Sequence, residues 1–537
     1  MNVAEYDFII VGAGTAGCTL ANRLTEDAGV RVLLLEAGGR DWDPLIHVPI
    51  GVGRMWKRRS HDWGYNTEPQ AQLNNRAIEL PRGKVLGGSS SINAMVYLRG
   101  DRGDYDRWAR NGLPDWSYAN VLPYFKKSES WIGGESAYRG GSGPVGTCWT
   151  DPDDPIVDAV LDAARQAGYP ITEDINGEHG EGFARTQSTL MNGRRSSAAA
   201  THLRQARGRP GLNVVSGATV TRILIENGKA IGVEYSRSGA LKTVHAAREV
   251  ILSGGAINTP QLMMLSGLGD SAQLGVHGIK VVASLPGVGQ NLQDHVAISV
   301  GFARKESGPL ARALRLDRIA WAMLQSYFLG TGVASNIPGG PMALLRTRPE
   351  LEVPDLQFAF RAIARDAAPW FPGLGRKWRD FCGFVPALLH PQSRGSVALG
   401  SADPAQPPRI QPNFLSVDAD FRPLLDGISI AREVARQEAL NKYCGDELFP
   451  GPKVDSEEAM RAYIRNTAGT FHHVCGTCRM GSDELAVVDP DLRVRGIENL
   501  RVVDASVLPD LPGANINACT FMLAEKAADL IRGVLPQ

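Results

Sequence analysis

Cysteine is scarce in this chain, and long apolar runs are missing. Its seven cysteines are scattered over 537 residues, unlike the dense, even set of a disulfide-rich secreted scaffold, and they favour a reducing, cytoplasmic location. The amino terminus shows no succession of basic, apolar and small residues, so no export signal is predicted. No run of about 18 or more uninterrupted apolar residues occurs, and the sequence predicts no membrane-spanning helix.

The chain also has no net charge. The 57 acidic residues balance the 57 basic residues, so no overall field would gather a polyanion, and nucleic acid is not an expected partner. Hydrophobic residues make up 43% and charged residues 21%, a composition that excludes wholesale disorder, collagen and coiled coil. Glycine is abundant instead, with 60 residues, and this richness indicates a backbone that approaches a large cofactor.

The opening of the chain predicts a strand, a tight turn, a helix and a second strand. Residues 7–11 and 30–36 are apolar runs, and residues 16–26 favour a helix. The turn fits G-x-G-x-x-G, whose glycines let the backbone approach a pyrophosphate at the helix amino terminus, and a carboxylate ending the second strand can bind a ribose. The fingerprint fits FAD and NAD alike. The residues predicted to bind the dinucleotide here are Gly12, Gly14, Thr15, Ala16, Gly17, Glu36 and Ala37.

Later segments predict a second unit and a return to the first. Residues 154–168 have the apolar period of a helix and open a second domain. Residues 212–235 alternate like paired strands and residues 249–253 form a short buried strand, and both segments return to the first domain. The chain closes with a buried strand at 499–503, a Pro-rich turn and an amphipathic helix at 519–534.

Two long stretches have little regular period. Residues 40–110 are rich in Trp, Gly, Arg and Asn, and an irregular segment of this length is expected to wrap a ligand. Residues 301–389 combine Pro and Gly clusters with aromatic residues. We expect this second stretch to face the substrate, although most of its aromatic side chains should pack in the core.

Three motifs resemble those of one enzyme family. Residues 83–97 (GKVLGGSSSINAMVY) resemble the first motif of the glucose-methanol-choline (GMC) family of FAD-dependent oxidoreductases. Residues 255–262 (GAINTPQL) with 266–269 (SGLG) resemble its second motif, and residues 286–295 (PGVGQNLQDH) are also similar to its members. Together with the opening and closing segments, the resemblance covers residues 7–531. The chain is therefore identified as a member of this family, in its bacterial branch of choline and alcohol dehydrogenase-like enzymes.

The resemblance implies an α/β fold with two domains. One is a glutathione-reductase-type FAD-binding Rossmann domain, and the other is a substrate domain built on a large antiparallel sheet. Residues 1–150, 196–300 and 461–537 would form the FAD-binding domain, and residues 151–195 and 301–460 the substrate domain. The resemblance also selects FAD over NAD.

The resemblance further implies which residues surround FAD. Small residues of the first motif would let the chain lie against the pyrophosphate and the ring, and the residues after them would supply backbone donors beside the ring. Val220 would meet the adenine through its backbone, and Asp504 with Ala505 would lie near the pyrophosphate and ribityl chain. The set predicted by resemblance is Val85, Gly88, Asn93, Ala94, Met95, Val96, Val220, Asp504, Ala505, Asn515 and Ile516.

Some family members attach FAD covalently through a histidine of the first motif. Here Ile92 occupies that neighbourhood, and no histidine lies between Lys84 and Gly100. Non-covalent FAD is therefore predicted. A helix starting after Asn517 would also point its positive end at the flavin and stabilise the reduced anion.

Oxidation of an alcohol needs a base for the hydroxyl proton, and a neutral histidine meets that need. Residues 471–481 (FHHVCGTCRMG) are similar to the family's catalytic-histidine motif, whose register selects His473 and not His472. The family's partner position corresponds to Asn515, which would hold the substrate oxygen. His472 is expected at most to shape the pocket, and Val474 stands where members often have proline.

The cysteines and the remaining histidines form no recognisable metal or catalytic motif. Cys475 and Cys478 have the spacing of a redox or zinc motif, but no second C-x-x-C would complete a zinc site, so packed thiols and no metal are expected. The histidines without a motif, expected to be packed polar residues, are His47, His61, His179, His202, His245, His277 and His390.

The predicted reaction is FAD-dependent oxidation of a primary alcohol to an aldehyde, with His473 taking the proton and hydride passing to flavin N5. Arg and Lys outnumber Asp and Glu within residues 301–389, which does not favour a cation pocket, so a neutral alcohol is preferred to choline. A quinone-like acceptor is predicted, with O2 as the alternative, so a dehydrogenase is favoured over an oxidase. The sequence leaves open a choline dehydrogenase or oxidase, a non-redox hydroxynitrile lyase-like enzyme, and a non-catalytic dinucleotide-binding protein.

Overall fold

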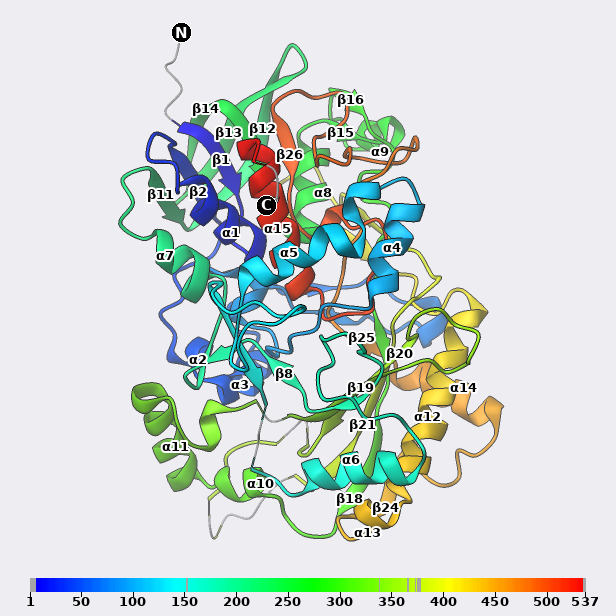
Figure 1. The fold of residues 1–537 in the computed structure, drawn as a ribbon. Coiled ribbons are helices and arrows are strands. Elements are labelled where there is room, and N and C mark those ends of the chain that lie inside the picture. Colours follow the sequence, from blue (N-terminus) through cyan, green and yellow to red (C-terminus); the bar gives the residue numbers. More distant parts are fainter. Residues whose placement is uncertain are drawn as a thin grey trace.

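The structure is a computed structural model and describes residues 6–150, 153–337, 339–364, 367–371, 373 and 378–534. Within these residues, one sheet has seven strands and a second has eight, and Figure 1 shows them in the upper and lower parts of the molecule. This arrangement confirms the predicted α/β class. Among the same residues no helix is both long and apolar enough to cross a bilayer.

The first sheet contains the amino-terminal βαβ unit. β1 (Tyr6–Val11) pairs in parallel with β2 (Val32–Glu36), and α1 (Thr15–Leu24) connects them, as the sequence predicts. Every β2 residue is buried, because a parallel strand is covered on both faces. The remaining strands of this sheet are β11 (Leu212–Ser216), β12 (Ala218–Glu226), β13 (Lys229–Arg237), β14 (Ala240–Leu252) and β26 (Leu500–Val502).

Two regions are more regular than expected. β14 begins well before residue 249, because its first half pairs with β13 in an antiparallel hairpin. Residues 40–110 contain helices α2 (Pro44–His47), α3 (Val52–Arg58) and α4 (Arg102–Arg110). These helices are too short to show a clear apolar period, so the sequence pattern did not reveal them.

The closing helix also differs from its prediction. α15 (Asn517–Arg532) packs between α1 and α5 (Tyr118–Ser128) and has twelve consecutive buried residues, so the expected amphipathic pattern is wrong. Its charged side chains are buried because they are paired. Glu525 bonds Arg23 Nε at 2.7 Å and His202 Nε2 at 2.9 Å.

The second sheet is antiparallel, in the order β24-β18-β21-β20-β19-β7, and β17 pairs with both β21 and β25. Helices α6 (Ile156–Gln166) and α12 (Phe421–Ala435) pack against it. β17 and β25 come from segments assigned above to the FAD-binding domain, and the domain boundaries stay a prediction. The strands are β7 (Gly182–Ala184), β17 (Val296–Ala297), β18 (Val300–Arg304), β19 (Gly339–Leu345), β20 (Leu356–Arg361), β21 (Phe381–Leu388), β24 (Cys444–Phe449) and β25 (Gly469–Thr470).

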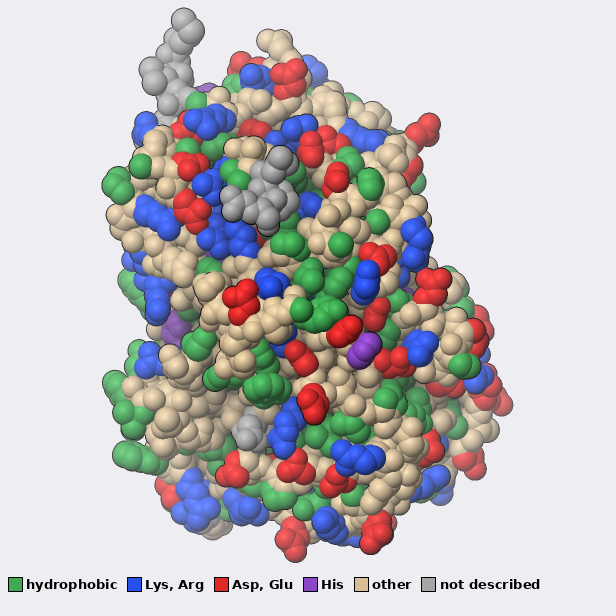
Figure 2. Space-filling model, viewed as in Figure 1, with side chains coloured by type: hydrophobic (Ala, Val, Ile, Leu, Met, Phe, Trp, Pro, Cys, Tyr) green, Lys and Arg blue, Asp and Glu red, His purple; other side chains and the backbone are tan. Residues whose placement is uncertain are grey.

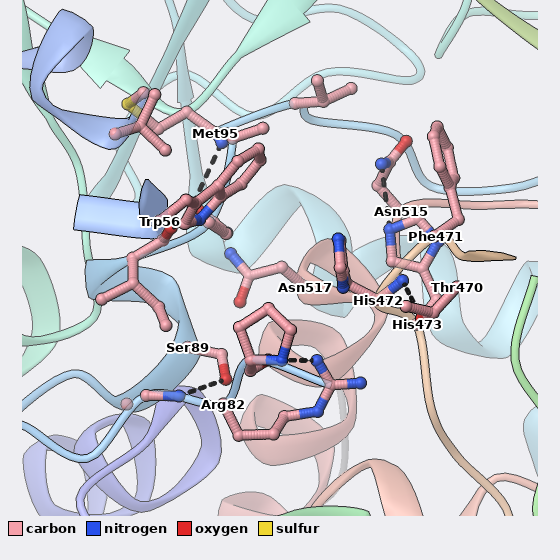
Figure 3. A pocket seen from close by; sticks show the side chains of 18 of the residues that line it. Trp56, Arg82, Ser89, Met95, Thr470, Phe471, His472, His473, Asn515 and Asn517 are labelled. Atoms are coloured by element: carbon pink, nitrogen blue, oxygen red, sulfur yellow. Dashed lines mark hydrogen bonds between the residues drawn. The ribbon is translucent and has the colours of Figure 1, made fainter. Parts of the chain in front are cut away.

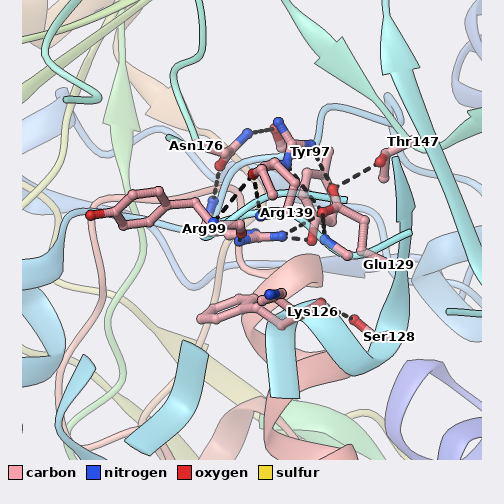
Figure 4. A network of polar contacts seen from close by, with 12 residues as sticks. Tyr97, Arg99, Lys126, Ser128, Glu129, Arg139, Thr147 and Asn176 are labelled. Carbon is pink, nitrogen blue, oxygen red and sulfur yellow. Dashed lines mark hydrogen bonds and ion pairs between the residues drawn. The ribbon is translucent and has the colours of Figure 1, made fainter. Parts of the chain in front are cut away.

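A buried ionic network supports the chain just after residues 83–97 (Figure 4). Glu129 accepts hydrogen bonds from Arg99 Nη2 and Arg139 Nη2, both at 2.5 Å, and from the Thr147 hydroxyl at 2.8 Å. Burial opposes ionisation of Glu129, but the two guanidinium groups outweigh it and lower its pKa. The backbone N–H of Arg99 also donates to Asn176 Oδ1 at 2.8 Å. The network therefore fixes the position of the segment that leaves the first motif.

Candidate active site

A cavity of about 1180 Å³ is lined by residues of both sheets. Most predicted site residues line it, but Gly17 and Val85 do not. A Cβ on Gly17 would lie 1.9 Å from Gly12 O, so this glycine lets α1 approach the turn, and Val85 is fully buried in an apolar cluster. The predicted residues that line the cavity are Gly12, Gly14, Thr15, Ala16, Glu36, Ala37, Gly88, Asn93, Ala94, Met95, Val96, Val220, His472, His473, Asp504, Ala505, Asn515 and Ile516.

One end of the cavity, called the dinucleotide end, is built from glycine and backbone of the βαβ unit. Gly12 has φ of +100°, and a Cβ there would lie 2.5 Å from Ser253 O, so the turn requires glycine. A Cβ on Gly14 would meet no atom within 4 Å, because this residue faces the cavity. Glu36 accepts hydrogen bonds from two backbone N–H groups at 2.8 and 2.9 Å, and burial raises its pKa to about 7.

Two helices begin at this end without a side-chain cap. They are α1, which begins at Thr15, and α15, which begins at Asn517. Thr15 Oγ1 donates a hydrogen bond to Asn517 Oδ1 at 2.7 Å and so joins the two helix starts. Helix amino termini carry partial positive charge and unsatisfied N–H groups, which suit a pyrophosphate and an electron-rich ring. These residues therefore fit FAD.

His473 and Asn515 lie side by side on the cavity wall (Figure 3). His473 Nε2 lies 3.1 Å from Asn515 Nδ2. Gln357 Nε2 donates to Asn515 Oδ1 at 3.1 Å, which orients the amide so that its N–H group points at the imidazole. His473 Nε2 is then a hydrogen-bond acceptor, and its single lone pair points at the Asn515 amide on the cavity wall. The backbone N–H of His473 donates to Asp294 Oδ1 at 2.7 Å and holds the backbone of this residue in place.

A second histidine, which the sequence reasoning missed, contacts the first. His295 Nδ1 lies 2.8 Å from His473 Nδ1, and the two rings meet edge to face at 87°. Since His473 Nε2 accepts from Asn515, its Nδ1–H is the donor to His295. His295 follows Asp294 at the end of residues 286–295, and this stretch supported the family resemblance without giving the histidine a role.

Burial controls the protonation of this group. Burial, with nearby His472 and Arg82, lowers the pKa of His473 to about 3, and burial also lowers the pKa of His295 well below its usual value. Both imidazoles are therefore neutral at physiological pH, and His473 is available as a base. Burial raises the pKa of Asp294 to about 6, while the charge of Arg82 opposes that rise.

Two residues beside the cavity have an unusual backbone. Met95 has φ of 64° and His472 has φ of 71°, values that residues other than glycine rarely adopt. Local hydrogen bonds hold both conformations, from Met95 N to Asn93 Oδ1 at 3.0 Å and from His472 N to Thr470 Oγ1 at 2.8 Å. Figure 3 shows Met95 and His472 on opposite sides of the cavity. Strain of this kind is typical of functional sites.

The remainder of the cavity, called the substrate end, includes His473, Asn515 and Gln357, and beyond them it is mainly apolar. Its wall comes from α10 (Pro309–Ala313), α11 (Leu316–Leu329) and the second sheet, and it includes Leu310, Leu314, Ile319, Met323, Phe360 and Ile363. Among the described lining residues, the acidic ones are Glu36 and Asp504, both next to strand ends of the first sheet. The basic lining residues are Arg54, Lys57, Arg58, Arg82 and Arg361.

Cys475 and Cys478 are buried thiols. Cys478 Sγ lies 3.7 Å from Met263 Sδ, and burial raises the pKa of both thiols well above the usual value. In the described part of the chain, no group of three or more His, Cys, Asp or Glu residues could hold a metal ion. The cysteine pair is therefore packed in the core rather than arranged as a reactive site.

Fold and site together define a class of protein. A βαβ unit with uncapped helix termini can hold a dinucleotide, and a neutral histidine paired with an amide lies on the wall of the same cavity. This is the arrangement of a flavin-dependent oxidoreductase that acts on an alcohol.

Comparison with known proteins gives the family. Two family models, both described as GMC oxidoreductase, match residues 6–297 and 391–524. The chain therefore belongs to the GMC oxidoreductase family, and it is an FAD-dependent oxidoreductase acting on the CH–OH group of its donor. The family, the cofactor and the reaction class predicted from the motifs are confirmed.

Relatives match the whole chain. The oxygen-dependent choline dehydrogenase of Photobacterium profundum is 42% identical over 99% of this chain and 94% of that protein. The mitochondrial choline dehydrogenase of Homo sapiens is 43% identical over 98% of this chain and 90% of that protein. A pyridoxine 4-oxidase structure from Mesorbium loti superposes with a TM-score of 0.89 at 29% identity, covering 99% and 100% of the two chains. A fungal aryl-alcohol oxidase superposes with a TM-score of 0.84 at 26% identity, covering 98% and 99%.

Proposed function

We propose that this chain oxidises an uncharged, mainly apolar primary alcohol to its aldehyde and passes the electrons to a quinone-like acceptor. The observation that carries the proposal is the 3.1 Å contact between His473 Nε2 and Asn515 Nδ2 at a cavity with an apolar substrate end. When bound, FAD supplies the acceptor for the hydride of the carbinol carbon.

The side chains of the wall then have distinct roles. The alcohol hydroxyl replaces the Asn515 N–H as the donor to His473 Nε2, and its proton then passes to the imidazole. Asn515 donates a hydrogen bond to the oxygen, and this bond strengthens as negative charge develops. His295 accepts the Nδ1–H of His473 and so keeps Nε2 unprotonated, as a base requires. His295 is therefore a positioning residue.

Non-covalent FAD is part of the proposal. Among the described residues, the histidines that line the cavity are His472 and His473, which lie on the wall near Asn515. In the first motif, Ile92 lines the cavity in the neighbourhood where some family members carry the linking histidine, and it cannot form a covalent link to FAD. Precipitation of the protein with acid should leave the yellow colour in solution. A yellow pellet would show a covalent link.

Choline is the second candidate, because the two relatives described above are choline dehydrogenases. A quaternary ammonium group is bound by aromatic faces with a carboxylate nearby. Here the acidic lining residues of the described chain, Glu36 and Asp504, lie at the first sheet, and the charged residue of β20 that lines the cavity is Arg361. This distribution favours a neutral alcohol over a cation.

Anaerobic mixing with a panel of alcohols tests the proposal. The panel contains choline, benzyl alcohol, octanol and a glycol ether, and the measurement is the second-order rate constant of flavin bleaching. We expect the best neutral alcohol to exceed choline by at least about 100-fold, about 2.7 kcal/mol of discrimination. A rate for choline equal to or above the neutral alcohols would contradict the proposal. Absence of bleaching with every alcohol would favour a lyase or a non-catalytic protein.

The acceptor and the location complete the proposal. Reoxidation of the reduced enzyme should be faster with a soluble quinone than with air, and the reverse order would make the enzyme an oxidase. We propose a cytoplasmic location because all seven cysteines are free thiols, which persist in a reducing compartment.

A further inference from the structure

The outer face of α11 carries large apolar side chains exposed to solvent. Trp321 is 69% exposed, Phe328 is 68% exposed and Leu329 is 72% exposed, with Leu316 and Leu324 also more than half exposed. Figure 2 shows hydrophobic side chains gathered at the lower left of the molecule, where Figure 1 places α11. A contiguous apolar surface of this kind marks a contact with a protein or a membrane.

The spacing of three of these residues shows that they form one stripe. Trp321, Leu324 and Phe328 are three and four positions apart and so share a face of the helix. Phe371, itself 53% exposed, extends the stripe, because the neighbouring Trp370 O accepts a hydrogen bond from Leu316 N at 2.8 Å. The α11 patch is defined as Leu316, Trp321, Leu324, Phe328, Leu329 and Phe371.

The opposite side of α11 lines the cavity. Ile319, Ala320 and Met323 contribute to the cavity wall, while Ala322 and Ser326 are buried in the protein. A surface helix of a soluble domain normally turns a polar face to water. α11 instead carries an apolar stripe towards solvent, and its one acidic residue, Asp317, lies on that face paired with Arg315 at 2.7 Å. Leu316 belongs to the patch and also lines the cavity, so the patch reaches the mouth of the substrate end.

Basic side chains lie beside the patch. Arg54, Lys57 and Arg58 are exposed on α3, which contains no acidic residue, and all three line the same cavity. Arg318 is exposed on α11 itself. The 3₁₀ turn η6 (Val333–Ser335) after α11 contacts the turn η1 (Pro49–Gly51) that leads into α3. These four residues form a basic rim, a local feature in a chain whose net charge is zero.

We propose that the α11 patch docks on an anionic lipid bilayer, with the basic rim against the phosphates and the cavity mouth facing the lipid. Apolar aromatic and leucine side chains bordered by Arg and Lys have the chemistry of an interfacial, peripheral membrane contact. An apolar alcohol and a quinone both dissolve in a bilayer, so docking would bring them to the substrate end. This route rests on the proposed function, whereas the docking itself does not.

Vesicle co-sedimentation of the FAD-loaded full chain tests the docking. The vesicles contain phosphatidylcholine, with or without phosphatidylglycerol, and no substrate is present. We expect binding to the anionic vesicles and at least about tenfold weaker partitioning to the neutral ones. A variant with Trp321→Gln, Leu324→Gln and Phe328→Gln should partition at least about tenfold less than the parent into anionic vesicles.

A matched control uses three exposed apolar residues elsewhere, Ile132→Gln, Leu241→Gln and Val276→Gln. This control should bind vesicles like the parent chain. Both variants should keep the parent melting temperature and the parent kcat/KM for a water-soluble alcohol, because none of the six residues lines the cavity.

Three outcomes would overturn the proposal. They are absence of vesicle binding by the parent chain, equal binding by parent and patch variant, and equal loss in both variants. If the parent is a dimer that the patch variant converts to a monomer, without vesicle binding, the patch is a subunit interface instead. The vesicle assay contains no substrate, so a negative result with every alcohol would contradict the proposed function without affecting the docking proposal.

Discussion

The two ends of the cavity are built in different ways. The dinucleotide end uses glycines, backbone groups and helix starts, most of them close together in the sequence. The substrate end depends on side chains that only the fold brings together, such as His295 and His473, 178 residues apart, and Gln357 and Asn515, 158 residues apart. Cofactor binding should therefore tolerate changes that stop the chemistry, and the following variants test that separation.

The largest effect should come from obstructing the dinucleotide end with Gly14→Val. The side chain would project into the cavity, where a Cβ meets no protein atom within 4 Å, so the fold should persist while FAD affinity falls at least about 100-fold. Flavin fluorescence titration of the apoprotein measures this. Gly29→Val, at an exposed glycine that is also open and lies away from the cavity, is the control and should bind FAD normally. Normal FAD affinity in Gly14→Val would place the dinucleotide elsewhere.

A smaller effect is expected at the substrate end from His295→Ala. Loss of the acceptor for His473 Nδ1–H frees the ring to change tautomer, so kcat should fall about 10- to 100-fold while FAD stays bound and KM changes little. His295→Asn offers an oxygen near the position of Nδ1 and should recover part of kcat. Equal losses in both variants, together with loss of FAD, would indicate a purely structural role.

Gln357→Leu should have a milder effect. The variant removes the 3.1 Å hydrogen bond that orients the Asn515 amide, at a cost of about 1 kcal/mol, so kcat should fall about fivefold with FAD affinity unchanged. Steady-state kinetics and flavin titration measure the two quantities. An unchanged kcat would show that Asn515 is oriented by other contacts.

The smallest effect on activity should come from pH. Burial lowers the pKa of His473 to about 3, so the base stays deprotonated from about pH 8 to about pH 5, and kcat/KM should show no acid limb from this residue. The unfolded chain would bind protons on His473 and His295 below about pH 6.5 whereas the folded chain would not, so the free energy of unfolding should decrease as the pH falls from that value. An acid limb with a pKa near 6.5 in kcat/KM would contradict this assignment.

The sequence predicts the dinucleotide end well because its determinants are consecutive. The apolar period locates β1, α1 and β2, and the glycine spacing locates the turn between them. The motif register also selects His473 and Asn515, which the structure brings into contact. His295 could not be given a role, since its role depends on a neighbour from a distant segment.

Burial is the second limit on prediction. The charged residues of α15 indicate a solvent face, yet Glu525 is buried because Arg23 and His202 pair with it. The converse case occurs in α11, where Trp321 and Phe328 are exposed although most aromatic side chains of residues 301–389 are buried, as predicted. The spacing of apolar residues along a helix shows which of them share a face, but the neighbouring elements determine whether that face is buried.

The central claim is that His473 is the base of the alcohol oxidation. Its most direct test is anaerobic stopped-flow mixing of FAD-loaded His473→Ala with the best alcohol of the panel, followed by the flavin absorbance. We predict that the variant keeps FAD but bleaches at least about 100-fold more slowly than the parent. Bleaching at a near-parental rate would contradict the account.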